Sequence, residues 1–328
     1  MDNIIVSGTP HVRSRESVQS IMRDVIIALV PATVMGIVFF GMKALLLIAI
    51  SIASSVFFEY LYQKIMKKTV TIDDLSAVVT GLLLALNLPV GASWWMPIVG
   101  SAFAIIIAKQ LFGGIGQNFV NPALIARAFL LASYPTAMTT WHVNGVAVAT
   151  PLATLKTAKD GAELVVSSAG VEGNLPSLFQ VITGQGIGGC IGETCAIALI
   201  IGFIYLLARK VISWRIPVVY VAVVFILNAV IGRYGVRMPV YEIFTGGLFL
   251  GAIFMATDYT TSPMTPKGQI IYACFCGLIT YLIRVYGGYP EGVSYSILIS
   301  NLAVPLIDRF TVGKIFGALP KTKEAKKA

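Results

Sequence analysis

The chain has 328 residues, of which 57% are hydrophobic and only 12% are charged, and its formal net charge is +9. Charged residues make up about 25% of an ordinary soluble domain, so this composition excludes that class and indicates a helical membrane protein. The positive charge does not indicate nucleic-acid binding, because the basic residues are distributed one loop at a time and follow apolar segments, as in membrane anchors. We therefore expect no nucleic-acid partner.

The N-terminal segment, residues 1–24, is polar and has no pattern typical of a cleaved signal peptide. About ten apolar segments follow, several of them shorter than the roughly 20 residues that cross a bilayer. The predicted spans are 25–40, 44–62, 75–88, 93–108, 122–134, 191–207, 216–231, 240–256, 269–285 and 293–310. We predict an all-α polytopic membrane protein.

The basic residues predict how these spans are oriented. Lys and Arg accumulate in cytoplasmic loops, and most of the 24 in this chain share one side when residue 1 is cytoplasmic. Lys67, Lys210 and the lysines of the basic tail 311–328 then lie in the cytoplasm, whereas Lys43 is external. We predict that both termini are cytoplasmic and that the long polar stretch 138–190 is external.

Two features predict a duplicated architecture with broken helices. The spans 75–88 and 122–134 are unusually short, and Thr80-Gly81 recurs five spans later as Thr245-Gly246. An offset of five spans reverses the orientation in the membrane, which is typical of inverted repeats with a site at their interface. We predict a first five-helix repeat at 25–137 and a second at 191–310, separated by the external loop 138–190.

The external loop contains the first candidate site. Thr150 carries a hydroxyl group directly before the rigid Pro151, and the predicted topology puts it on the external side of the membrane. Further along, residues 184–189 match the glycine fingerprint G-x-G-x-x-G by letter. That fingerprint needs a preceding strand and a βαβ unit, so we interpret this glycine run as a loop.

Ionisable and thiol side chains near membrane depth leave several alternatives open. Arg127 is either a paired structural arginine or an anion contact. Asp258 and Asp308 are either interfacial caps or a cation entrance, because carboxylate oxygens suit a hard ion. Cys190 and Cys195 are buried free thiols or an external disulfide.

Five segments, in order through nearly the whole chain, carry a resemblance to a known family. They are Gln117-Asn118-Phe119-Val120-Asn121-Pro122-Ala123-Leu124, Ala149-Thr150-Pro151-Leu152-Ala153, Ile191-Gly192-Glu193-Thr194, Met255-Ala256-Thr257-Asp258 and Asn301-Leu302-Ala303-Val304-Pro305-Leu306-Ile307-Asp308. The chain resembles the D subunits of Rnf ion-translocating electron transport complexes, relatives of the B subunit of the sodium-pumping NADH:quinone reductase.

The resemblance implies FMN esterified through its phosphate to Thr150, in a modification made by a separate flavin transferase. It also implies a noncovalent riboflavin near the cytoplasmic side, held by Asn118 and Asn121. An amide pair can bond a flavin ring edge, yet Asn121 also suits the role of a helix cap. Asp258 and Asp308 match acidic positions that the family associates with ion uptake.

The resemblance further implies a function. The chain is expected to be a membrane subunit, inactive alone, of a ferredoxin:NAD⁺ oxidoreductase in a bacterial or archaeal cytoplasmic membrane. It relays electrons across the bilayer with partner iron-sulfur and flavin subunits, coupled to Na⁺ or H⁺ export. The alternatives are a secondary transporter without redox activity, which inverted repeats also indicate, and a purely structural anchor.

Overall fold

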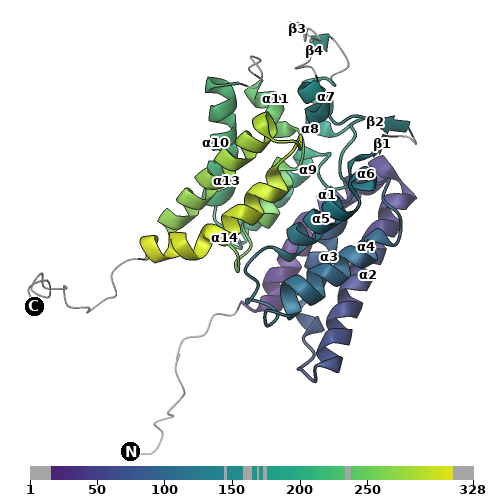
Figure 1. Cartoon of the computed structure of the whole chain (residues 1–328), viewed down its shortest axis with the longest axis vertical. Helices are drawn as coiled ribbons and strands as arrows, with labels where there is room; N and C mark the ends of the chain where they lie inside the picture. Colours follow the sequence, from purple (N-terminus) through teal and green to yellow (C-terminus); the bar gives the residue numbers. More distant parts are fainter. Residues whose placement is uncertain are drawn as a thin grey trace, which may run out of the picture.

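The computed structural model describes residues 16–143, 146–157, 165–167, 170–172, 176–232 and 238–312. Most of them are helical (Figure 1). The first half contains α1 (Val18–Phe40), α2 (Met42–Ile65), a 3₁₀ turn (Ile72–Asp74), α3 (Ser76–Leu86), α4 (Met96–Ala102) with a π-helical continuation (Phe103–Gln110), and α5 (Pro122–Ser133). The second half contains α9 (Ala196–Ala208), α10 (Arg215–Val230), α11 (Pro239–Phe244), α12 (Leu248–Leu250) with a π-helical continuation (Gly251–Met255), α13 (Pro266–Tyr286) and α14 (Val293–Thr311).

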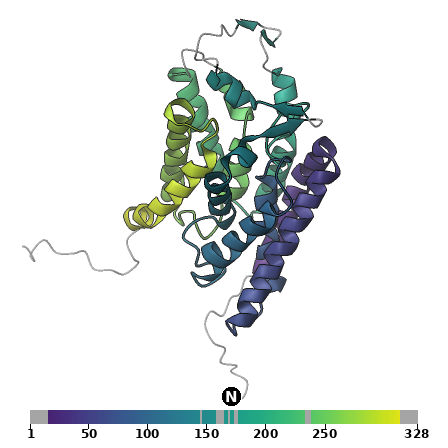
Figure 2. The same ribbon diagram turned by 45° about the vertical axis from the view of Figure 1, so that its right-hand side comes forward.

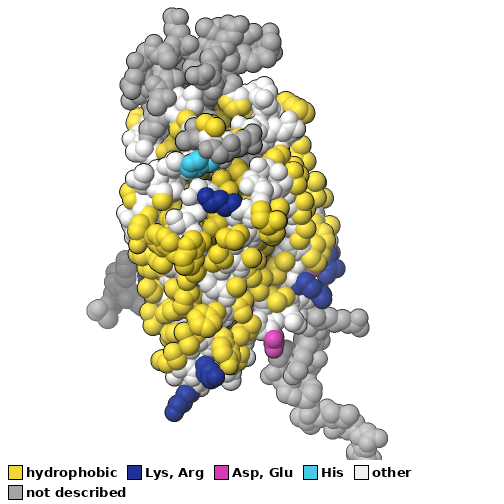
Figure 3. Space-filling view, turned by 90° about the vertical axis from the view of Figure 1, so that its right-hand side faces the viewer, with side chains coloured by type: hydrophobic (Ala, Val, Ile, Leu, Met, Phe, Trp, Pro, Cys, Tyr) yellow, Lys and Arg dark blue, Asp and Glu magenta, His cyan; other side chains and the backbone are white. Residues whose placement is uncertain are grey.

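Every predicted span coincides with one or more of these helices. Among the described residues, α1, α2 and α13 are long and apolar enough to cross a membrane, and shorter apolar helices accompany them. Large apolar side chains also point outward, including Val38, Ile204 and Leu302, which are 67%, 60% and 61% exposed. Hydrophobic side chains predominate over much of the face in Figure 3. The chain is therefore a helical membrane protein whose outer surface suits lipid.

The segment between the halves, predicted as a loop, contains short strands as well as helices, so the chain is mostly but not entirely helical. It contains α6 (Pro135–Thr139), β1 (Trp141–Val143), β2 (Val146–Val148), α7 (Pro151–Thr157), β3 (Val165–Ser167), β4 (Gly170–Glu172) and α8 (Leu178–Thr183). The strands form two antiparallel hairpins, β1–β2 and β3–β4. Their short valine-rich runs suit strands better than helices. The hairpins and α7 lie at one end of the bundle, uppermost in Figures 1 and 2.

Glycines allow the long helices to approach closely. A Cβ at Gly202 of α9 would collide with the backbone carbonyl oxygen of Ala28 in α1. A Cβ at Gly277 of α13 would lie 2.7 Å from Val223 Cβ in α10. Small residues at such crossings bring backbones together where no hydrophobic effect drives association.

The backbone after α3 is not helical and pairs with the second half of the chain. Pro89 and Cys190 form an isolated antiparallel bridge. The Ile191 and Gly192 amides donate to the carbonyls of Leu88 and Leu86, at 3.0 Å and 2.8 Å. Non-helical backbone inside a membrane protein needs such partners. The pairing explains why the predicted span 75–88 is short and why α9 begins only at Ala196.

The predicted span 240–256 is also broken, at a Thr-Gly-Gly sequence within an otherwise apolar run. Between α11 and α12, the Thr245 carbonyl accepts a hydrogen bond of 3.2 Å from the Arg284 guanidinium. The Gly247 amide donates to Glu291 Oε1 at 2.5 Å. Gly246 takes a positive φ of 69°, a conformation that glycine adopts at little cost. Two charged side chains therefore stabilise a break in the middle of an apolar run.

Candidate functional site

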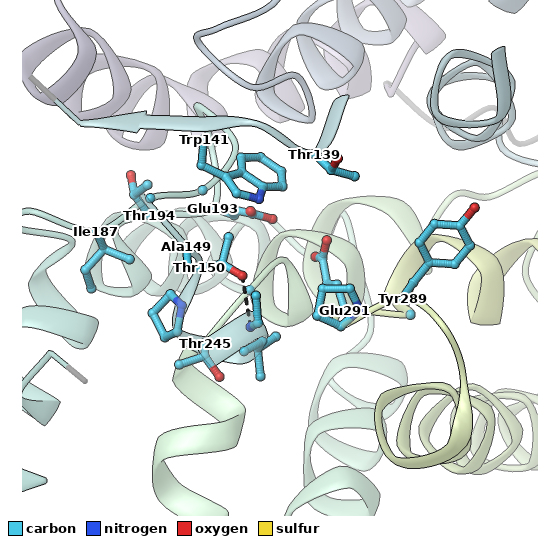
Figure 4. A pocket seen from close by; sticks show the side chains of 18 of the residues that line it. Thr139, Trp141, Ala149, Thr150, Ile187, Glu193, Thr194, Thr245, Tyr289 and Glu291 are labelled. Carbon is cyan, nitrogen blue, oxygen red and sulfur yellow. Dashed lines mark hydrogen bonds between the residues drawn. The ribbon is translucent and has the colours of Figure 1, made fainter. Parts of the chain in front are cut away.

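The first candidate site is a cavity of about 300 Å³ beneath α7 and the β1–β2 hairpin, which we call the outer cavity. Its walls include Trp141, Thr150, Ile187, Glu193 and Glu291. Figure 4 shows the Thr150 hydroxyl and the two carboxylates pointing into the same space. Ligand pockets of this kind are mostly apolar, hold a few convergent polar groups and measure about 300–1,000 Å³.

Thr150 directly precedes α7 and caps its N-terminus. Its Oγ1 accepts a hydrogen bond from the Ala153 amide at 3.1 Å, and its carbonyl accepts from the Thr154 amide at 2.9 Å. Pro151 occupies the first helical position, where its fixed φ is favourable. Buried Leu152 and Leu155 attach α7 to the molecule. The half-buried Thr150 side chain is thereby held at the wall of the outer cavity.

The glycine run 184–189 forms a loop along one side of this cavity. Gly184 ends α8 with a positive φ of 84°. A Cβ at Gly188 would lie 2.7 Å from Val148 Cγ2 and 3.2 Å from Trp141 Cβ. The glycines therefore let this loop pack against the β1–β2 hairpin, in agreement with the predicted loop.

A buried ion pair lies at the base of the outer cavity. Arg127 Nη2 is 2.7 Å from Glu291 Oε2 and 3.5 Å from Cys190 Sγ, and Nη1 donates to the Ser294 hydroxyl. Of the two alternatives for Arg127, the paired structural arginine is the one observed. Burial raises the pKa of the Glu291 carboxyl, but the adjacent Arg127 and the Gly247 amide outweigh it and hold that pKa below its usual value.

Glu193 approaches the same space from the segment before α9. Its Oε1 accepts a hydrogen bond of 2.7 Å from the Cys190 amide. The residue is only 7% exposed, and Oε2 is buried without a hydrogen-bond donor. Neither Glu193 nor Glu291 was among the predicted site residues. The signal available in the sequence was that Glu193 is an acidic residue at the start of an apolar run. That position gives no indication that Glu291 lies nearby in the fold.

The second candidate site is a cavity of about 390 Å³, which we call the inner cavity. Asn118, Asn121, Lys109 and Asp258 line it together with the first turns of α1. Three of the predicted site residues therefore lie together. Asp308 does not line this cavity and instead accepts a hydrogen bond of 3.3 Å from the Met264 amide.

Both asparagines already have partners. Asn121 Oδ1 accepts from the amides of Ala123 and Leu124, at 3.0 Å and 3.2 Å, so the predicted cap of α5 is confirmed. Its Nδ2 donates to the Met255 carbonyl at 3.3 Å. Asn118 Nδ2 donates to the Val120 carbonyl at 3.1 Å. A ligand that bonds either amide group in the inner cavity would therefore have to replace a hydrogen bond that this amide makes to the backbone.

Asp258 lies in the loop after the second π-helical segment. Its Oδ2 accepts from the Thr261 hydroxyl at 3.2 Å, and Oδ1 is 3.5 Å from the Thr260 amide. Burial raises the pKa of this carboxyl, although hydrogen bonds from Thr260, Thr261 and Asn118 oppose the rise. A half-buried carboxylate with these neighbours suits transient neutralisation by a proton or a small cation.

The thiols and potential metal ligands are less informative. All four cysteines are free, so the alternative of a Cys190–Cys195 disulfide is wrong; Cys190 and Cys195 are buried, and Cys274 is exposed. Within the described residues, no group of three or more His, Cys, Asp or Glu side chains could hold a metal ion.

The two cavities lie at opposite ends of α1. Val18, Ile21 and Met22, at its start, line the inner cavity. At its other end, the Phe39 ring lies against Gly184, which begins the loop beside the outer cavity. A helix of 23 residues is about 35 Å long, close to the thickness of a bilayer core. The arrangement separates the Thr150 site from the asparagine site by one membrane-length helix.

Comparison with known proteins identifies the family. The family model described as NQR2, RnfD, RnfE matches residues 5–317. The chain is 52% identical over 99% of its length, and 98% of the relative, to the D subunit of the Na⁺-translocating ferredoxin:NAD⁺ oxidoreductase complex of Acetobacterium woodii. It is 47% identical, over 95% of its length and 96% of the relative, to the D subunit of the proton-translocating complex of Clostridium ljungdahlii. The chain therefore belongs to the NQR2, RnfD, RnfE family.

Proposed function

We propose that this chain is the D subunit of an Rnf-type ion-translocating ferredoxin:NAD⁺ oxidoreductase, with FMN bound through its phosphate to Thr150. The observation that carries the proposal is the separation of two ligand-sized cavities at opposite ends of α1, one with Thr150 on its wall and the other with Asn118 and Asn121. The names of the relatives support membership of a multisubunit redox complex.

The residues of the outer cavity fit a tethered flavin. Thr150 supplies the hydroxyl that a flavin transferase would join to the phosphate, and its half-buried position leaves it accessible. Trp141, Tyr289 and apolar side chains such as Ile187 offer flat and apolar surfaces for a ring system. A flavin, when bound, supplies one- and two-electron transfer. The protein's part is to fix that group at one end of the bundle.

The inner cavity fits the proposed riboflavin and the ion path. Asn118 and Asn121 have amide groups that can bond the edge of a flavin ring, and Asp258 lies in the same cavity. Asp308, on α14, is assigned to the same ion path from its match to the family. The coupling ion is Na⁺ or H⁺, and the two relatives described above are named for different ions.

The proposal includes a topology. About ten spans in two inverted repeats place the termini in the cytoplasm and the Thr150 loop outside a bacterial or archaeal cytoplasmic membrane. Residues 1–15 and 313–328, whose basic side chains contributed to this prediction, lie outside the described residues. Supporting observations are the spanning length of α1 and the position of the inner cavity at its N-terminal end.

The test is covalent flavin on the chain itself. A denatured gel band from cells that contain the flavin transferase should fluoresce under ultraviolet light, and peptide mass spectrometry should find FMN on Thr150. The Thr150→Ala variant should be dark, whereas the control Thr154→Ala, one turn along α7, should fluoresce. A dark wild-type band would refute the flavin assignment and favour a secondary transporter. Unchanged electron transfer in Thr150→Ala would instead favour a structural anchor.

A further inference from the structure

The outer cavity contains more negative than positive charge. Arg284 lies 3.3 Å from Glu242, and Arg127 lies 2.7 Å from Glu291. Glu193 is the third carboxyl group in this region and, among the residues that the structure describes, the only one of the three without a guanidinium partner. Of the described residues that line the cavity itself, two carboxyl groups, Glu193 and Glu291, face one guanidinium group, Arg127. An uncompensated buried charge is costly, so the arrangement favours the uptake of one positive charge.

The geometry shows where that charge is needed. The position that a Cβ on Gly247 would take lies 2.8 Å from Glu193 Oε2 and still closer to Glu291 Oε1, so the two carboxyl groups face one another. Glu291 Oε1 already accepts a hydrogen bond from the Gly247 amide, whereas Glu193 Oε2 has no donor. Figure 4 shows both groups directed into the cavity near Thr150.

We infer that Glu193 and Glu291 share one proton and form a protonatable site that opens onto the outer cavity. The proton resides on Glu193 and is donated toward Glu291. Glu291 is the ionised member because Arg127 and the Gly247 amide stabilise its negative form. Protonation converts the donorless Oε2 into a donor and leaves the group formed by Glu193, Glu291 and Arg127 electrically neutral.

Other ionisable groups around the pair do not replace this proton. Arg127 of α5 is paired with Glu291, and Arg284 of α13 is paired with Glu242 of α11. Among the described residues that line the cavity or contact Arg127, the other titratable groups are the Cys190 thiol and the hydroxyls of Tyr289 and Tyr295. These groups are neutral in their ordinary protonated forms, so they cannot compensate a second carboxylate.

The site has a consequence that rests on the proposed function. A group bound at Thr150 would have a proton donor and acceptor within its own cavity. Glu193 is then a positioning and proton-exchanging residue for whatever ring occupies the cavity. The protonation itself requires only residues of this chain, so it can be tested without the flavin.

The test is infrared difference spectroscopy of the lipid-reconstituted complex, in which a protonated carboxyl group has a carbonyl band that shifts in D₂O. We expect such a band at neutral pH, and its loss as the pH rises. The band should disappear in Glu193→Gln, because that substitution removes the carboxyl group. It should also disappear in Glu291→Gln, because Arg127 then loses its partner and its positive charge stabilises the ionised form of Glu193. The matched control is Glu59→Gln, since Glu59 is equally buried but paired with Lys109 at 2.8 Å.

Two further measurements make the outcome decisive. Glu193→Gln can still donate to Glu291, so we expect it to keep the thermal stability of the wild type at neutral pH and to lose the destabilisation that the wild type shows in alkali. Thr150→Ala should retain the band, which separates this inference from flavin attachment. The inference is overturned if wild type has no protonated-carboxyl band sensitive to Glu193→Gln, or if Na⁺ abolishes that band at constant pH.

Discussion

Arg127 and Glu291 form an ion pair of 2.7 Å across a sequence separation of 164 residues. It joins α5, in the first half of the chain, to the loop before α14 in the second half. Glu291 in turn accepts from Gly247 at the break between α11 and α12. One buried pair therefore connects both halves to the floor of the outer cavity.

Removing the guanidinium should be strongly destabilising. Arg127→Met leaves Glu291 as a buried carboxylate without its cation, a change that costs about 3–5 kcal/mol in buried pairs. The thermal midpoint of the detergent-extracted protein should fall, whereas the exposed control Lys43→Met should leave it unchanged. The double variant Arg127→Met with Glu291→Gln should recover part of the loss. Simple additivity of the two substitutions would show that the residues do not interact.

The crossing of α1 and α9 gives a second stability prediction. At Gly202 even one methyl group collides with the Ala28 carbonyl oxygen, and a backbone atom cannot turn aside as a side chain does. Gly202→Ala should therefore cost about 1–3 kcal/mol through overpacking. The neighbouring Ile201 is 52% exposed, so Ile201→Ala should have a much smaller effect on the melting temperature. Equal melting temperatures for the two variants would contradict the close crossing.

How much of the structure can be predicted from the sequence depends on how far apart in the chain the interacting residues lie. Runs of apolar residues are local, and they located every helix of spanning character. Thr150 could be singled out because the pattern from which its role is proposed lies in its neighbours in the chain. The break at Gly246 and the contact of Glu193 with Glu291 depend on residues some 40 to 100 positions away, and no local pattern indicates such contacts. The Thr245-Gly246-Gly247 triplet was the one local sign of the break.

Neutralising the inner carboxylates should impair ion movement. Asp258→Asn keeps an acceptor for the Thr261 hydroxyl but removes the charge from the inner cavity. We expect ferredoxin-driven ion uptake by inverted vesicles to fall severalfold, with covalent flavin unchanged. Asp308→Asn, outside the cavity, should cause a smaller loss, and the exposed control Asp73→Asn none. Normal uptake in both Asp258→Asn and Asp308→Asn would remove them from the ion path.

The two ends of α2 provide the test of topology. Lys43 and Lys64 are both exposed and lie near opposite ends of this 24-residue helix, one of the three long enough to cross a membrane among the described residues. In a Cys274→Ser background, which removes the exposed native thiol, Lys43→Cys should react with a membrane-impermeant maleimide in intact cells. Lys64→Cys should react only after the membrane is permeabilised. The reverse pattern would place the Thr150 cavity in the cytoplasm, because the Lys43 end of α2 follows directly from the end of α1 that packs beside that cavity.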